Sequence, residues 1–421
     1  MTAIEPIALR DVDLTDLDAF ARNKGWAMFD TLRREDPVHW NEERDGGSGF
    51  WAVTRHEDIC AVDKDPDRFT STKFVNLEEV DDDLMDIRRS MLETDGSRHR
   101  ALRKLIHREF SAGNLMRNYE DFLRGLTRQT LDEALAEAEF DFVRSISADF
   151  PIQVLARLLD VPSSDTDQLI DWGNQMVGNT DPDYTQFRAD QPQSQQYKHL
   201  PFRTPVSLDV FAYGRELARQ RRGGSGTDLV SQLVNKLPED GQPLSEHDFD
   251  NYFLLLVIAG NETTRHAISQ SMLALIEHPE QLHTLQERPE LIAPAVEEML
   301  RWASPVYHFR RTATRDTELG GKQVKEGDKV VMWFASGNRD DAVFPDPYRF
   351  DVTRTNVDHV TFGKGSPHTC LGNMLARMEI RLMFEELLPR LRRIDLAGEV
   401  TRVRSNFVNG IKTLPVRVTL A

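Results

Sequence analysis

Apolar residues recur at helical spacing over several long stretches of the chain, which predicts a mainly helical fold. The clearest stretches are residues 122–135, 152–159, 208–217, 291–300 and 373–388. Ser245 is placed to cap a further helix that starts near Glu246. This helix would continue over residues 253–276 and is apolar on nearly every side at its middle. A helix with that pattern belongs at the centre of a large fold.

Strand signals are fewer and shorter, and they gather toward both ends of the chain. They cover residues 38–40, 50–53 and 317–334. Asn409-Gly410 separates residues 405–408 from residues 411–416, which is a typical hairpin signal. The predicted fold class is therefore mainly α with a minor β part.

Composition narrows the function classes. The 421 residues show no composition shift or linker, so we expect a single domain over residues 1–421. Lys and Arg number 52 against 69 Asp and Glu, and the net charge of −17 argues against nucleic acid as the main partner. The longest apolar run, residues 252–260, is shorter than the ~20 residues that span a bilayer. Residues 1–17 resemble no signal peptide or anchor, so a cytoplasmic protein without membrane insertion is expected.

Two cysteines cannot form a disulfide framework, and they differ in setting. Cys60 is expected to be a small core residue. Cys370 lies in a glycine-rich loop just before a predicted helix, where backbone N–H groups favour a thiolate. Such a thiolate can be the axial ligand of a haem iron. A buried free cysteine is the alternative, but the surrounding glycines would let a flat porphyrin approach the backbone.

The middle of the long apolar helix carries the sequence Ala259-Gly260-Asn261-Glu262-Thr263-Thr264. Polar groups at that depth are costly unless they have partners, and Gly260 weakens the helix by about 1 kcal/mol relative to alanine. A small residue there leaves a gap toward which a threonine hydroxyl can point. This suits a small ligand and proton transfer to it. The alternative is a threonine that only bonds back to a carbonyl one turn earlier.

Several charged residues are spaced to share a helix face. Glu298 and Arg301 are three apart, and such a pair is usually a surface ion pair of little energetic value. Other basic side chains could clamp two carboxylates by charge-assisted hydrogen bonds, with a solvated basic face as the alternative. These are His99, Arg103, Arg311 and His368.

Other enzyme classes lack their sequence motifs. The chain has no Gly-x4-Gly-Lys-Ser/Thr phosphate loop and no Gly-x-Ser-x-Gly nucleophile turn. His278 and His283 are five apart, which is the wrong spacing for a zinc-protease helix. The remaining candidate chemistry is that of Cys370 and the long helix.

Together these features resemble a soluble bacterial cytochrome P-450, a haem-thiolate monooxygenase. The resemblance covers residues 40–418, and four motifs occur in the family's order. They are the His99/Arg103 helix, the sequence from Ala259 to Thr264, the Glu298/Arg301 pair and the Cys370 loop. The resemblance implies a single-domain cytochrome P-450 fold with haem b, iron protoporphyrin IX, as cofactor.

The resemblance also implies a role for each motif residue. Cys370 is the iron ligand, and Glu262 and Thr263 form an acid–alcohol pair that delivers protons to dioxygen. Glu298 and Arg301 are a buried structural pair, extended by Arg354 or a neighbour. The implied haem contacts are His99, Arg103, Ala259, Gly260, Arg311, Phe362, His368 and Gly372, with His99, Arg103, Arg311 and His368 on the propionates.

The Cys370 loop departs from the family's commonest pattern. Phe362 lies eight residues before Cys370 rather than seven, and Ser366-Pro367 stands where a glycine is usual. The longer loop is similar to the branch that hydroxylates terminal methyls of sterols and methyl-branched lipids. Residues 328–340 are equally similar to terminal hydroxylases of alkanes and fatty acids.

The implied reaction inserts one oxygen atom from O2 into an unactivated C–H bond of a small hydrophobic substrate. The expected target is a terminal methyl of a steroid, isoprenoid or branched lipid, and the alternatives are a small cyclic terpenoid or a linear alkyl chain. A haem-thiolate sensor or electron carrier is the rival class. The expected pocket residues are Tyr252, Leu256, Val257, Val306, Tyr307, Phe309, Phe407 and Val408.

Electrons are expected from a ferredoxin and a ferredoxin reductase, with a monomer as the oligomeric state. A basic face could dock an acidic electron carrier. The residues expected on that face are Arg98, Arg100, Lys104, Arg108, Lys364 and Arg377.

Overall fold

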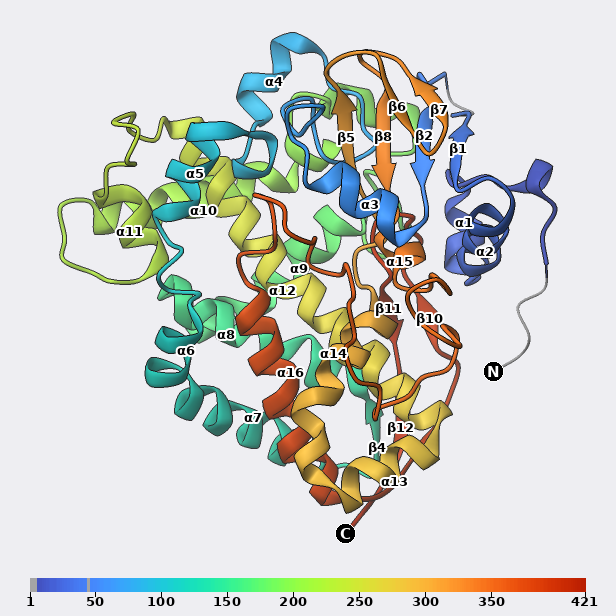
Figure 1. Ribbon diagram of the computed structural model, residues 1–421. Coiled ribbons are helices and arrows are strands. Elements are labelled where there is room, and N and C mark those ends of the chain that lie inside the picture. Colours follow the sequence, from blue (N-terminus) through green and yellow to red (C-terminus); the bar gives the residue numbers. More distant parts are fainter. Residues whose placement is uncertain (1–5, 44–45) are drawn as a thin grey trace. The chain divides into compact units, whose positions relative to one another are not determined.

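The computed structural model, drawn in Figure 1, describes residues 6–43 and 46–421. The chain separates into two compact units. Unit 1 comprises residues 1–79, 270–370 and 402–411. Unit 2 comprises residues 80–269, 371–401 and 412–421. Unit 1 holds the largest sheet of the described chain, and unit 2 holds most of the helices.

Unit 1 is built around a five-stranded sheet with the strand order β1-β2-β8-β5-β3. Strands β2 and β8 run parallel, and the other neighbours run antiparallel. A separate hairpin joins β6 and β7. The strands predicted over residues 38–40, 50–53 and 317–334 are therefore confirmed. Their bounds are β1 (Val38–Asn41), β2 (Phe50–Val53), β3 (Phe69–Thr70), β5 (Phe309–Ala313), β6 (Thr317–Leu319), β7 (Lys322–Val324) and β8 (Lys329–Met332).

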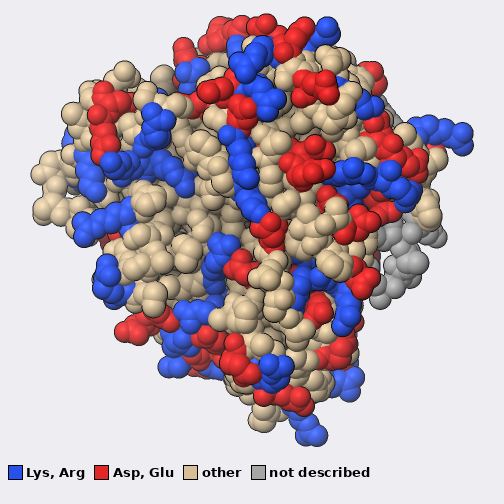
Figure 2. Space-filling model, in the orientation of Figure 1, with Lys and Arg blue, Asp and Glu red and all other residues tan. Residues whose placement is uncertain are grey.

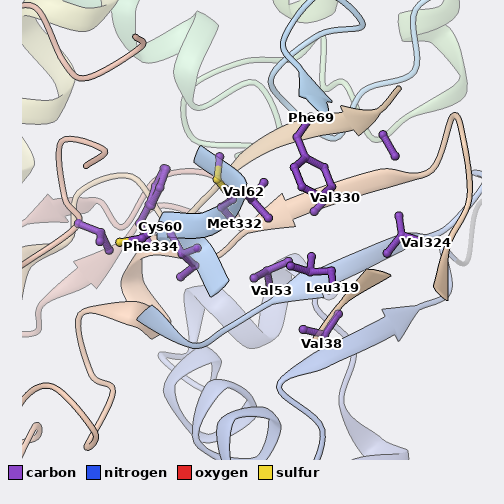
Figure 3. Packing of buried hydrophobic residues seen from close by; sticks show 13 residues of the cluster. Val38, Val53, Cys60, Val62, Phe69, Leu319, Val324, Val330, Met332 and Phe334 are labelled. Atoms are coloured by element: carbon purple, nitrogen blue, oxygen red, sulfur yellow. The ribbon is translucent and has the colours of Figure 1, made fainter. Parts of the chain in front are cut away.

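Buried apolar side chains cover both faces of this sheet, because successive side chains along a strand point to opposite faces. Val53 and Met332 pack on one face in a cluster with α3, which Figure 3 shows. Ala52 and Val331 belong to a second cluster with α1 and α2. Cys60 lies in the first cluster, as predicted. The helices of unit 1 are α1 (Leu17–Ala21), α2 (Gly25–Glu35), α3 (His56–Asp63), α13 (Pro279–Glu287), α14 (Ile292–Ala303) and α15 (Phe334–Gly337).

Unit 2 is mainly helical and contains a small antiparallel sheet with the order β4-β12-β9. The helical stretches predicted from periodicity are confirmed by α7, α8, α10 and α16. Its helices are α4 (Asp82–Arg88), α5 (Gly96–Lys104), α6 (Ala112–Asn118), α7 (Glu120–Ala134), α8 (Asp149–Leu159), α9 (Thr166–Val177), α10 (Val206–Arg221), α11 (Leu229–Asn235) and α16 (Asn373–Leu387). Its strands are β4 (Glu139–Asp141), β9 (Leu391–Leu396) and β12 (Pro415–Leu420).

Helix α12 (Glu246–Glu277) is the long helix that the apolar pattern predicts, and its residues up to 269 belong to unit 2. The Asp248 N–H donates to Ser245 Oγ at 3.0 Å, and the Ser245 N–H donates to Asp248 Oδ2 at 2.9 Å. These reciprocal bonds satisfy amide groups that a helix start leaves without partners. Ser245 therefore caps the helix as expected. Within the described residues, no helix is long and apolar enough to cross a membrane.

The hairpin expected around Asn409-Gly410 forms with a different partner strand. Strand β11 (Ile411–Thr413) pairs with β10 (Thr401–Arg402), whereas residues 405–408 form no named strand. The Ser405 hydroxyl accepts the N–H groups of Phe407 and Val408 at 3.0 and 3.1 Å. The prediction was wrong in this detail, because a side chain that bonds to nearby backbone competes with strand pairing.

Candidate functional site

The Cys370 loop closes on itself at its last residue. The Cys370 N–H donates to the Phe362 carbonyl at 2.8 Å, so the backbone between them folds back as a loop. Gly363 and Gly365 have φ angles of +72° and +68°, which residues with a side chain adopt only with strain. The Cys370 thiol is exposed, and α16 begins three residues later. An accessible thiol beside a helix start fits the role of a metal ligand.

Ser366 and Pro367, where this loop differs from the family's commonest pattern, lie in a hydrogen-bonded turn. Ser366 Oγ accepts the His368 N–H at 3.0 Å. The Ser366 carbonyl accepts the Thr369 N–H at 3.1 Å and the Thr369 hydroxyl at 2.8 Å. Serine therefore adds one side-chain hydrogen bond to the turn, which a glycine at this position could not supply.

Two of the candidate carboxylate-binding residues lie in unit 1 with Cys370. The Arg311 guanidinium donates through Nη2 to Asp63 Oδ1 at 3.0 Å, and both side chains are almost fully buried. His368 Nε2 lies 3.2 Å from Ser71 Oγ. The other two candidates, His99 and Arg103, lie on α5 in unit 2, where His99 is buried. Sequence spacing gave no indication of Asp63 or Ser71 as partners.

Some residues in the middle of α12 are accessible to solvent, although their neighbours along the helix are buried. Ala259 is exposed and Gly260 and Thr263 are partly exposed, whereas Asn261 and Glu262 are buried. We call the accessible residues Ala259, Gly260 and Thr263 the α12 notch. The Thr263 hydroxyl donates to the Ala259 carbonyl at 3.0 Å, which is the back-bonding arrangement weighed as the alternative. Accessible small residues in an otherwise buried helix are compatible with a flat bound group, and the accessible Cys370 thiol of unit 1, taken by itself, fits the iron ligand of a haem.

Glu262 lies on the buried side of the same helix in an ionic cluster. Its Oε1 accepts Arg265 Nη1 and Asn261 Nδ2, each at 3.2 Å. Its Oε2 lies 3.4 Å from His266 Nε2. Burial by itself would raise the pKa of Glu262, but Arg265 and His266 hold this pKa below its usual range. The carboxylate is therefore ionised, and burial lowers the pKa of His266, which keeps the imidazole neutral.

Residues distant in sequence complete this cluster within unit 2. Arg265 donates to Asn174 Oδ1 at 2.7 Å and to the Tyr184 hydroxyl at 3.1 Å. A Cβ atom at Gly173 of α9 would lie only 2.9 Å from Glu262 Oε1, so α9 packs closely on the carboxylate. Sequence analysis missed Asn174 and Tyr184, whereas Arg265 and His266 could have been found from their helical spacing to Glu262.

Glu298 and Arg301 form a fully buried pair in unit 1. Two bonds of 2.6 and 2.7 Å join the guanidinium to the two carboxylate oxygens. Arg354 approaches Glu298 Oε2 at 3.3 Å, which confirms the expected third member. Arg301 also donates to the carbonyls of Asn338 and Pro347 at 2.8 and 2.9 Å. The pair therefore ties α14 to the segment that precedes the Cys370 loop.

The expected pocket residues divide into buried and accessible sets. Tyr252 is 2% exposed, and its hydroxyl donates to the Leu102 carbonyl at 3.0 Å. Side chains with almost no accessible surface cannot line an open pocket, so four predictions are corrected to core positions. These are Tyr252, Val257, Tyr307 and Val408. Leu256 is 9% exposed, and the partly exposed residues are Val306, Phe309 and Phe407.

The expected basic docking face is partly neutralised. Acidic and basic side chains are interspersed over the face that Figure 2 shows. Three of the six basic residues form ion pairs, which removes part of the positive charge on which that prediction depends. The pairs are Arg98 with Asp240 and Asp248, Lys104 with Glu239, and Lys364 with Asp358.

Comparisons with known proteins agree with this geometry. The family model "Cytochrome P450" matches residues 43–412. Linalool 8-monooxygenase of Pseudomonas putida is 38% identical over 415 residues, covering 96% of this chain and 98% of that protein. Methyl-branched lipid omega-hydroxylase of Mycobacterium bovis is 36% identical over 421 residues, covering 97% and 95%. A solved Mycobacterium marinum cytochrome P450 in complex with pseudoionone has a TM-score of 0.87 and 34% identity, covering 99% of this chain and 100% of that one.

These matches extend along nearly the whole chain. They confirm the predicted fold class, a mainly α single domain with a minor β part. They also decide against the rival class of sensor or electron carrier, because the matched relatives are monooxygenases and hydroxylases. The chain therefore belongs to the cytochrome P450 family and is a haem-thiolate monooxygenase.

Proposed function

We propose that this monooxygenase hydroxylates a terminal methyl group of a methyl-branched aliphatic chain, either an isoprenoid or a branched lipid. The observation that carries the reaction type is the α12 notch, with the Thr263 hydroxyl at an accessible position and the ionised Glu262 beside it. The substrate class is supported by the relatives. The names of two relatives refer to linalool and to methyl-branched lipids, and one solved structure contains pseudoionone. These compounds share a methyl-branched chain.

The residues that the family resemblance indicates would hold the cofactor. Cys370 would be the thiolate ligand of the haem iron, and the four basic side chains His99, Arg103, Arg311 and His368 would hold its propionates. Phe362 and Gly372 would lie against the haem from the Cys370 loop, and Ala259 and Gly260 from α12. When bound, the haem supplies the oxidation chemistry, and a thiolate ligand favours O–O cleavage.

The overall reaction consumes the hydrocarbon, O2, two electrons and two protons, and it yields an alcohol and water. The chain's part is to supply the protons and to keep bulk water out. Thr263 Oγ1 would pass a proton toward the notch and then be reprotonated from the interior. Glu262 would accept a proton from the interior and release it again readily, because Arg265 and His266 hold its pKa below the usual range.

The substrate wall would be apolar, with Val306, Phe309 and Phe407 as its accessible members in unit 1. Phe309 and Phe407 form an edge-to-face aromatic pair with ring centroids 5.7 Å apart. Such a surface holds a flexible chain by shape and burial of apolar area.

Electrons would come from a ferredoxin and its reductase. Arg100, Arg108 and Arg377 would be among the residues that supply basic charge for an acidic carrier. Replacing these three arginines with glutamine should slow electron delivery. Replacing Arg98 should have a smaller effect.

The substrate assignment is tested by optical titration of the purified ferric protein with a matched pair of ligands. Phytanic acid and hexadecanoic acid share a chain length and a carboxylate, and only phytanic acid carries methyl branches. We expect the Soret band to shift toward the high-spin form at a lower concentration of phytanic acid. Equal or tighter binding of the linear acid, or a shift only with a monocyclic terpenoid, would contradict the proposal.

The proton-relay assignment is tested by Thr263→Ala, with Thr264→Ala as the matched control. Thr264 is buried, so its replacement keeps the α12 notch unchanged. Thr263→Ala should lower the yield of hydroxylated product per reducing equivalent, whereas Thr264→Ala should not. An unchanged yield in Thr263→Ala would refute the role of this hydroxyl.

A further inference from the structure

Helix α3 of unit 1 forms hydrogen bonds at both of its ends with the Cys370 loop and the segment just before it. At its start, His56 Nε2 lies 2.8 Å from the carbonyl of Asp358, four residues before Phe362, where the loop begins. At its end, Asp63 Oδ2 accepts the Lys364 N–H at 3.1 Å, six residues before Cys370. Between these points, apolar residues of α3 share a core cluster with Val360, two residues before the loop. The position of the loop is therefore coupled to that of α3.

The Asp63 carboxylate joins this loop to a second element. While one oxygen accepts the Lys364 N–H, the other accepts Arg311 Nη2 from β5 at 3.0 Å. Asp63 and Arg311 are 4% exposed, so water screens the two charges little. A Cβ atom at Gly363, whose φ is +72°, would lie 2.9 Å from Asp63 Oδ2. The loop thus approaches the carboxylate more closely than a side chain at position 363 would permit.

The guanidinium of Arg311 could bind both Asp63 and a haem propionate. Its Nη1 donates to the Arg310 carbonyl at 3.0 Å, and its Nη2 donates to Asp63. A guanidinium presents five N–H donors in a planar fork, so one arginine can bind several acceptors, a propionate among them. The carboxylate of Asp63 would then determine both the orientation and the net charge of the group that meets the propionate.

We propose that Asp63 is a positioning residue for the haem. It fixes Arg311 and the Cys370 loop relative to each other, and its negative charge offsets the positive charge that Arg311 brings to the haem edge. This inference rests on the proposed binding of haem by Cys370 and Arg311. It adds an acidic residue distant in sequence from every motif. Its consequence is that Asp63 sets the reduction potential of the haem without touching the iron or the substrate.

The test is a double-mutant cycle read out as the reduction potential of the holoprotein. Asp63→Asn keeps an oxygen that can accept the Lys364 N–H but removes the negative charge, so the potential should rise. Arg311→Gln removes the positive charge and should lower it. Each shift is expected to be about tenfold in the reduction equilibrium constant, which is ~59 mV for a one-electron couple. The double variant should return close to the wild-type value.

Glu57→Gln is the matched control, because Glu57 is an exposed carboxylate on the same helix. It removes one negative charge as Asp63→Asn does, and the potential should stay at the wild-type value. Single variants that shift the potential in the same direction, or a double variant that shifts further than either, would overturn the proposal. Both results would indicate loosened packing rather than compensating charges.

Unstable single variants would still leave the proposal testable. Each single leaves one buried charge uncompensated, whereas the double leaves none. The double variant should therefore unfold at a higher temperature than either single. Equal losses in all three would overturn the charge-balancing role. A wild-type protein without the Soret spectrum of a thiolate-ligated haem would instead refute the proposed function of Cys370.

Discussion

Removing Arg265 should expose how strongly the protein holds Glu262 in its ionised form. In Arg265→Met, the side chain keeps a similar length but loses its charge and its bonds to Glu262, Asn174 and Tyr184. Leaving one charge of a buried pair without its partner costs about 3–5 kcal/mol. Arg265 and Glu262 are 3–4% exposed, so this range applies near pH 7.

The sign of the pH dependence follows from the pKa of Glu262. In the wild-type protein this pKa is depressed, so the pair stabilises the fold above the usual carboxyl pKa of about 4.3 and loses that effect as the pH falls through the depressed value. In Arg265→Met, burial dominates and raises the pKa of Glu262. The stability deficit of the variant should therefore grow as the pH rises from about 4 to 7.

The assay is urea unfolding of the holoprotein at several pH values, with Arg219→Met as the matched control. Arg219 pairs with Glu216 on the exposed surface of α10, and such pairs contribute about 0–1 kcal/mol. A deficit for Arg265→Met that equals that of Arg219→Met would refute the buried ion pair. So would a deficit that stays constant across this pH range.

Three further predictions concern other buried polar groups. Glu298→Gln should lower the free energy of unfolding by about 3–5 kcal/mol, measured against the surface variant Glu290→Gln, because it leaves Arg301 without its charge partner. Burial lowers the pKa of His308 from 6.5 to about 4, so the wild-type protein should lose ~3 kcal/mol of stability through this residue as the pH falls between those values. His308→Gln should remove that part of the acid-side loss in urea titrations. Tyr252→Phe should cost about 1 kcal/mol in thermal unfolding and leave the substrate dissociation constant unchanged, since its hydroxyl bonds to Leu102 in the core.

Most of the secondary structure and the motifs could be predicted from residues that are close together in the sequence. Ser245 could be recognised as a cap from its position before an apolar run. The spacing of Glu298 and Arg301 indicated an ion pair, but only the family resemblance implied that the pair is buried, as the structure shows. The Cys370 loop was visible because glycines and a helix start lie next to each other in the chain. These features depend on neighbours within a few residues, so the sequence displays them directly.

Long-range contacts were not accessible in the same way. Tyr184 meets Arg265 across 81 positions, and Asp63 meets Arg311 across 248 positions. No periodicity links such residues, because only the tertiary fold brings them together. The apolar pattern of α12 likewise could not separate Tyr252 and Val257, which lie in the core, from residues on a pocket wall. The strand expected over residues 405–408 failed because the Ser405 hydroxyl takes its backbone donors.

The most direct test of the proposed reaction is product analysis after turnover under heavy-isotope O2 with phytanic acid, a ferredoxin, its reductase and NADH. The account predicts one product whose new hydroxyl group lies on a terminal methyl and carries one labelled oxygen atom, with the second atom released as water. A product oxidised at an internal carbon, or a hydroxyl oxygen that comes from solvent, would contradict it.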